Sequence, residues 1–91
     1  MTPYEKLIGY LEDKLETVHD RHDALVKKIE SAREGIRREV ADPIIGETHA
    51  DHLISLAADL KGYLREASAI EKETVSIMGA LRRAREAARC E

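Results

Sequence analysis

Residues 41–46 read ADPIIG, and this stretch decides how the chain folds. Pro43 disfavours helical backbone geometry at Asp42, and Gly46 can adopt a positive φ angle, so the stretch predicts a turn. On both sides of it, the apolar residues keep a helical spacing without a break. The sequence therefore predicts a turn at about 42–47 between a first helix over about 3–41 and a second over about 48–89.

Short polar motifs offer starting points for both helices. Thr2-Pro3-Tyr4-Glu5 is a capping box with proline at the first helical position: the Thr2 hydroxyl accepts from a free backbone N–H, and Glu5 reaches back. Thr48-His49-Ala50-Asp51 is a second box that would start the second helix. Asp42-Pro43 would cap the same helix about a turn earlier, and the sequence leaves both starts open.

The apolar spacing in both segments is that of a coiled coil. Steps of four and three residues alternate, which is the heptad repeat (positions a to g) with apolar residues at a and d. Ile8 and Leu53 each begin a heptad at position a. The first seam is Tyr4, Ile8, Leu11, Leu15, Val18, His22, Leu25, Ile29, Ala32 and Ile36; the second is His49, Leu53, Leu56, Leu60, Tyr63, Ala67, Ile70, Thr74, Ile77, Leu81, Ala84 and Ala88.

Two seams of similar length joined by a short turn can cover each other only by folding back. We therefore expect an all-α, coiled-coil-like antiparallel two-helix hairpin that forms one domain over residues 1–91. The charges agree with this direction, because acidic and basic groups would meet both at the free end and near the turn. At the free end these are Glu5, Glu12, Asp13 and Glu16 with Arg82, Arg83, Arg85 and Arg89; near the turn they are Lys27, Lys28, Arg33, Arg37 and Arg38 with Asp51, Asp59 and Glu66.

The apolar stripe is wider than one seam needs. Ala57, Leu64 and Met78 occupy e positions of the second helix, and the first helix adds Val26 and Val40. A stripe of this width is typical of helix bundles, and a two-helix hairpin cannot cover it alone. These five residues therefore predict a protein interface. We expect a homodimer or higher homo-oligomer forming a four-helix bundle, with docking on a larger, different protein as the rival interpretation.

All four histidines occur in two H-x-x-H pairs, His19 with His22 and His49 with His52. This spacing places both rings on one side of a helix, as a metal site requires. The pairs would lie far apart along a hairpin, however, and the motif alone lacks a third and fourth ligand. We therefore expect structural histidines and no metal or other cofactor, and metal binding at these four residues stays the alternative.

Charge and composition narrow the function classes. The net charge is −3, and aromatic residues make up 3% of the chain, too few to offer stacking platforms for bases. Arg82, Arg83, Arg85 and Arg89 form a basic end that could bind an anion, but we expect acidic neighbours there, so nucleic acid is not the expected partner. The single cysteine, Cys90, is expected to be an idle exposed thiol.

No catalytic or phosphate-binding motif occurs in the sequence, and no apolar run could span a membrane. With no signal peptide at the start of the chain, we expect a cytoplasmic location. The function we expect is non-enzymatic and based on protein–protein contacts, as an assembly component, adaptor or small inhibitor. The small size suggests an accessory protein such as phages or mobile elements encode. The alternative is a ligand-binding bundle, for a metal at the histidines or for nucleic acid or another phosphate ligand at the arginines.

Overall fold

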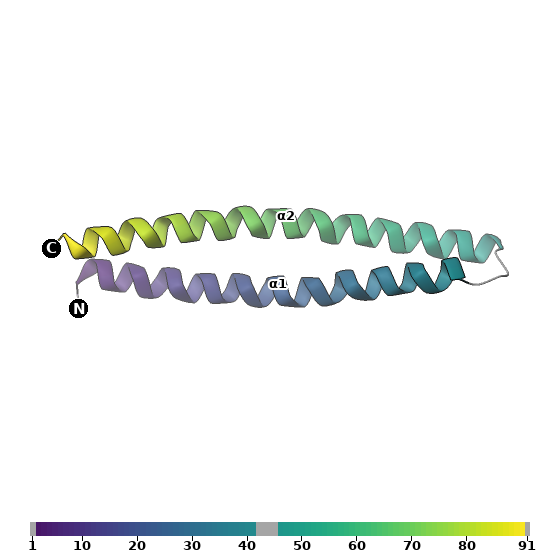
Figure 1. The fold of residues 1–91 in the computed structure, drawn as a ribbon, viewed down its shortest axis with the longest axis horizontal. Helices are drawn as coiled ribbons and strands as arrows, with labels where there is room; N and C mark the ends of the chain where they lie inside the picture. The colour runs from purple at the N-terminus through teal and green to yellow at the C-terminus, as the bar shows by residue number, and fades with distance from the viewer. Residues whose placement is uncertain (1, 42–45, 91) are drawn as a thin grey trace. The chain divides into compact units, whose positions relative to one another are not determined.

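The computed structural model describes residues 2–41 and 46–90. They form two helices, α1 (Pro3–Ala41) and α2 (Glu47–Arg89), and the described ranges contain no strand. The two helices pair as an antiparallel helical hairpin (Figure 1), which confirms the predicted all-α fold class. The described chain divides into two compact units. Unit 1 combines the residues up to His22 with those from Ala69 onward, and unit 2 runs from Asp23 to Ser68.

The two helices start in different ways. The capping box of α1 is confirmed: the Glu5 backbone N–H donates to Thr2 Oγ1 and the Thr2 backbone N–H donates to Glu5 Oε2, both at 3.2 Å. α2 begins at Glu47, and the Gly46 carbonyl accepts from the Ala50 N–H at 3.1 Å. Thr48 therefore lies inside the helix, and its proposed capping box is wrong. Gly46 has no positive φ angle, and the Asp42-Pro43 alternative and most of the predicted turn lie outside the described residues.

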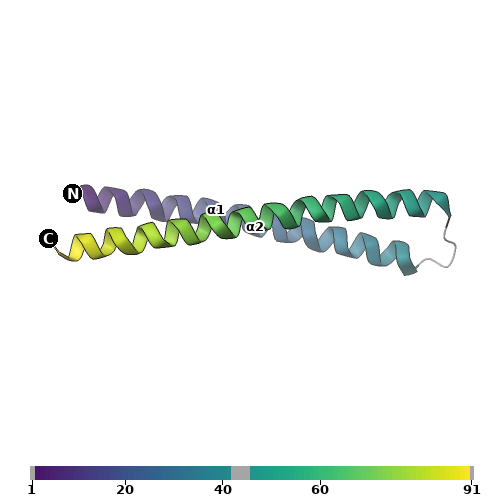
Figure 2. The same ribbon diagram turned by 90° about the horizontal axis from the view of Figure 1, so that it is seen from above.

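Unit 1 contains most of the fully buried side chains. Val18 of α1 and Ile70 of α2 are both 1% exposed, and each occupies a d position of its seam. Two ion pairs join the helices of this unit, Arg85 Nη2 to Glu12 Oε1 at 3.3 Å and Arg21 Nη1 to Glu73 Oε2 at 3.2 Å. The first pair confirms that the acidic start of α1 lies beside the basic end of α2. Figure 2 shows the α1 and α2 segments of each unit running next to one another.

Unit 2 has a thinner core, in which Leu25 and Ala32 are the buried apolar side chains. Its helices approach closely at Gly35, where a Cβ atom would lie 3.2 Å from Cδ1 of Leu56. A residue without a side chain thus lets Leu56 pack against the α1 backbone. The arginines near the end of α1 pair within their own helix, Arg37 with Glu34 at 3.0 Å and Arg38 with Glu34 at 3.3 Å.

Candidate interaction face

The contact between the two helices is centred on the d positions. Of the eight buried apolar residues among those described, seven are at d, and Leu81 is the one a residue. The remaining a positions are half-buried, although their side chains as a group are no more polar than those at the d positions. The helices therefore pack with the d side inward, and the a side is left partly open. The half-buried a residues are Ile8, Leu15, His22, Ile29, Ile36, Leu53, Leu60, Ala67, Thr74 and Ala88.

Positions e and b follow a around a helix, so the open a side continues into them. We call this surface the open face: the exposed apolar residues at e and b together with the half-buried a residues. In unit 1 it includes Val75, 71% exposed, and Met78, 55% exposed. In unit 2 it includes Ile54, 69% exposed, and Leu64, 47% exposed, with Val26, Val40 and Ala57 also exposed.

All five interface residues predicted from the sequence, Ala57, Leu64, Met78, Val26 and Val40, are therefore exposed. Sequence reasoning missed Ile54, which extends the open face of unit 2, and Val75, which extends that of unit 1. The signal was present, because both residues lie at b positions, next to the e positions that were considered.

The open face is hollowed in both units. In unit 1, one hollow is lined by Leu15, Met78 and Arg82 among others, and a second by His22, Thr74 and Val75 together with neighbouring residues. In unit 2, a hollow is lined by Ala57, Leu60 and Leu64 among others. Each hollow includes a half-buried a residue beside exposed e or b residues, which is the surface shape that accepts side chains from another helix.

The opposite side of each unit, at positions g and c, is mainly polar. In unit 1 it carries the Arg21–Glu73 ion pair, and in unit 2 it carries charged groups such as Asp59 and Lys28. The exceptions are Leu7, 44% exposed, and Tyr10, 60% exposed, near the start of α1. In unit 2 the exposed large apolar side chains are thus all on the open face, whereas in unit 1 they are divided between the two sides.

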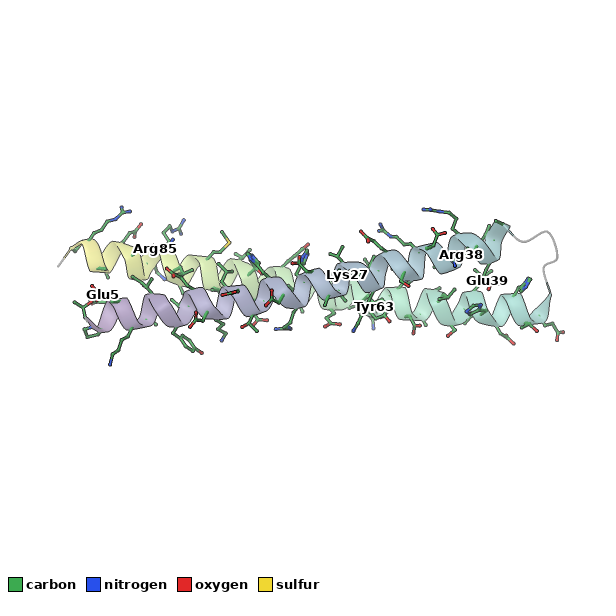
Figure 3. All side chains as sticks on the ribbon, turned by 90° about the horizontal axis from the view of Figure 1, so that it is seen from below. Glu5, Lys27, Arg38, Glu39, Tyr63 and Arg85 are labelled. Carbon is green, nitrogen blue, oxygen red and sulfur yellow. The ribbon has the colours of Figure 1, made fainter. Side chains whose placement is uncertain are left out.

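The two histidine pairs belong to different units and have different neighbours. In unit 1, His19 is exposed and His22 half-buried, and both line the hollow beside Thr74. In unit 2, Nδ1 of His52 lies 2.6 Å from Glu39 Oε1, and Nε2 of His49 lies 3.9 Å from Glu39 Oε2. Figure 3 shows Glu39 on the side of α1 that faces α2. Within the described part of the chain, no group of three or more histidine, cysteine, aspartate or glutamate residues could hold a metal ion.

Sequence reasoning missed Glu39, whose side chain is 18% exposed. The first seam was followed only to Ile36, and the next step of three residues leads to Glu39 at a d position. A carboxylate at this position interrupts the apolar spacing, so the spacing of apolar residues could not identify Glu39. The signal was the combination of a charged residue at d with two histidines near the start of the second helix.

The predicted anion-binding arginines, Arg82, Arg83, Arg85 and Arg89, are all exposed. Three of them line the first hollow of unit 1, but Glu12 and Glu86 line it too, and Arg85 is paired with Glu12. Acidic groups among the arginines weaken the attraction for an anionic ligand. Cys90 is exposed and forms no disulfide.

Neither α1 nor α2 has a described stretch that is both long and apolar enough to cross a membrane. Comparison of the chain with family models, curated proteins and solved structures finds no match.

Proposed function

We propose that the chain is a non-enzymatic interaction protein that associates with a second copy through the open face, giving a four-helix bundle. The observation that carries this proposal is the burial pattern of the described residues of α1 and α2, in which seven of twelve d residues are buried, whereas ten of eleven a residues are only half-buried. A hairpin that used its whole apolar stripe internally would bury a and d alike. In the cell, such a bundle would act through protein contacts, as an assembly component, adaptor or small inhibitor.

The energetics favour covering this face. Fully burying one Leu, Ile, Val or Met side chain contributes about 1.5–3 kcal/mol. Ile54, Leu64, Val75 and Met78 are each at least 47% exposed, and a two-fold dimer would cover two copies of each. Only part of this gain becomes association free energy, because association also costs translational and rotational freedom.

Sedimentation equilibrium tests the proposal. We expect the wild-type chain to have about twice the mass of one chain, and Leu64→Glu to weaken the association by at least about tenfold, since it places a charge in an apolar contact. Tyr10→Glu is the matched control, because Tyr10 is 60% exposed but lies on the opposite side of α1. A fully helical monomer at high concentration would refute self-association and point to a different protein as the partner of the open face.

A further inference from the structure

In unit 2, α2 carries an exposed apolar stripe on the open face. The b and e positions that form it are, in order, Ile54, Ala57, Lys61, Leu64 and Ser68, and we call these five residues the α2 stripe. A hollow lies in the stripe, and every described residue that lines it belongs to α2: Ala57, Leu60, Lys61, Leu64, Arg65 and Ser68. Lys61 is the one charged member of the stripe. Its aliphatic stem can lie along an apolar surface while its ammonium group stays in water.

The corresponding positions of α1 in unit 2 are mainly charged. In order along the helix they are Asp23, Val26, Glu30, Arg33, Arg37 and Val40, all exposed. Three consecutive charged positions therefore separate the two valines, and both signs of charge occur. Burying this side of α1 would take charged groups out of water, which costs free energy unless each of them finds a partner. Within unit 2, α2 is thus the helix that offers an apolar contact.

Unit 1, considered by itself, shows the same difference between its helices. Val75 and Met78, the large apolar side chains exposed on its open face, both belong to α2. The e and b positions of α1 in the described part of this unit are four polar residues and one glycine: Glu5, Gly9, Glu12, Glu16 and His19. Each unit independently places the apolar part of the open face on α2.

The charges beside the α2 stripe are compatible with a second copy of the same stripe. Glu47 and Asp51 lie near the start of α2, whereas Lys61 and Arg65 lie further along it, and all four are exposed. A surface with both signs of charge can be complementary to its own copy, because acidic residues of one chain can meet basic residues of the other. A two-fold dimer uses the same surface patch on both chains. Charge and symmetry together therefore allow α2 to bind α2.

Resting on the proposed self-association, we propose that the second copy is bound through α2, so that α2 of one chain packs on α2 of the other and both α1 helices remain at the margin. Packing of α2 on α1 of the second copy would instead set the α2 stripe against Glu30, Arg33 and Arg37. That contact would bury three charges beside apolar side chains. Packing of α2 on α2 places apolar residues together and requires only that the Lys61 ammonium stay at the edge.

Glutamate substitutions at equivalent positions of the two helices test this proposal. Leu64 of α2 and Val26 of α1 are both at e positions of unit 2, and they are 47% and 36% exposed. We expect Leu64→Glu to raise the dissociation constant at least about tenfold, and Val26→Glu to leave it within about threefold of wild type. Both variants add the same charge, so net charge cannot cause the difference. Sedimentation equilibrium measures the dissociation constants.

Ile54→Glu and Val40→Glu form a second matched pair, because Ile54 of α2 is 69% exposed and Val40 of α1 is 61% exposed. We expect the same contrast between the two helices. Circular dichroism of each variant shows whether the helices still form, so that a loss of affinity is not mistaken for unfolding.

Cysteine labelling provides a measurement that adds no charge. In a Cys90→Ser background, single cysteines are placed at positions 54 and 64 of α2 and at positions 26 and 40 of α1. Their reaction rates with a maleimide are compared well below and well above the dissociation constant. We expect association to slow Ile54→Cys and Leu64→Cys at least about tenfold, because a thiol covered by the second copy is not accessible. Val26→Cys and Val40→Cys should change by less than about threefold.

The outcomes separate this proposal from self-association itself. Equal protection of the α1 and α2 cysteines, or an equal loss of affinity in Val26→Glu and Leu64→Glu, would overturn the α2 contact and leave self-association intact. A wild-type chain that stays monomeric, with labelling rates independent of protein concentration, would overturn both proposals.

Discussion

Glu39 and His52 join α1 to α2 in unit 2 through a contact of 2.6 Å between Oε1 and Nδ1. Because a carboxylate only accepts, the imidazole N–H donates this hydrogen bond. The Glu39 side chain is 18% exposed and occupies a d position, where the heptad repeat otherwise holds an apolar residue. A polar residue in a seam lowers stability but penalises wrong registers, since sliding one helix would leave its carboxylate without a donor.

A double-mutant cycle measures this contact. We expect Glu39→Ala and His52→Ala to show a coupling free energy of about 0.5–1.5 kcal/mol in denaturant unfolding, because each variant removes one side of the hydrogen bond. The Glu34–Arg37 pair is the control: its arginine side chain is 78% exposed, and both residues belong to α1. Exposed pairs of this kind contribute about 0.3–0.5 kcal/mol. Equal coupling in the two cycles would show that Glu39 and His52 do not hold the helices together.

Replacing each of two helical glycines by alanine should change the stability of the hairpin in different ways. Gly62 has nothing within 4 Å of an added Cβ atom, so Gly62→Ala should raise the free energy of unfolding by about 0.5–1 kcal/mol through helix propensity. Gly35→Ala gains the same propensity, but its Cβ would lie 3.2 Å from the Leu56 side chain. We expect Gly35→Ala to gain less than Gly62→Ala, or to destabilise the hairpin.

Thermal or urea unfolding of the two glycine variants beside wild type provides the comparison. The double variant Gly35→Ala, Leu56→Ala completes the test, because removing the crowded side chain should recover the propensity gain of Gly35→Ala relative to Leu56→Ala alone. Equal stabilisation by Gly35→Ala and Gly62→Ala would mean that the helices can separate slightly at no cost.

The heptad pattern predicted the fold because every seam residue is in fact buried or half-buried. The spacing of apolar residues is visible in the sequence itself, and it indicates which side of each helix is buried. The start of α2 was harder to predict, because Gly46 supplies a carbonyl and no side chain, so a search for side-chain caps selected Thr48 instead. The sequence also could not show which of a and d would be the more deeply buried, since both are apolar and the choice depends on how the helices rotate.

The candidate site was predicted only in part for the same reason. The e-position residues Leu64 and Met78 were identified as surplus apolar surface, and the structure exposes them. Ile54 and Val75 at b positions join the face only once the a side is known to be open. Contacts such as that of Glu39 with His52 join residues across the hairpin, so they depend on a register that apolar spacing sets only approximately.

Adding zinc tests whether either histidine pair binds a metal ion. We expect that adding zinc or nickel does not raise the melting temperature, because the described residues hold no group of three potential ligands. His19→Ala with His22→Ala, and separately His49→Ala with His52→Ala, show which pair responds if a shift occurs. Sub-micromolar binding that one double variant abolishes would establish a metal site at that pair.

Ile70 and Val75 separate the stability of the hairpin from its association. Ile70 is 1% exposed at a d position, so Ile70→Ala should lower the free energy of unfolding by about 2–4 kcal/mol at any protein concentration. Val75, in the same unit, is 71% exposed on the open face, so Val75→Ala should change the stability of the monomeric hairpin by less than about 0.5 kcal/mol.

The difference between the two positions should depend on protein concentration. Well below the dimer dissociation constant, only Ile70→Ala should shift the urea midpoint. Well above it, Val75→Ala should also shift the midpoint, because association stabilises the folded chain by mass action and Val75→Ala weakens that association. Urea unfolding at two concentrations about a hundredfold apart makes the comparison. A Val75→Ala effect as large at low concentration as at high would mean that Val75 packs within the hairpin and that the open face is not where a second copy binds.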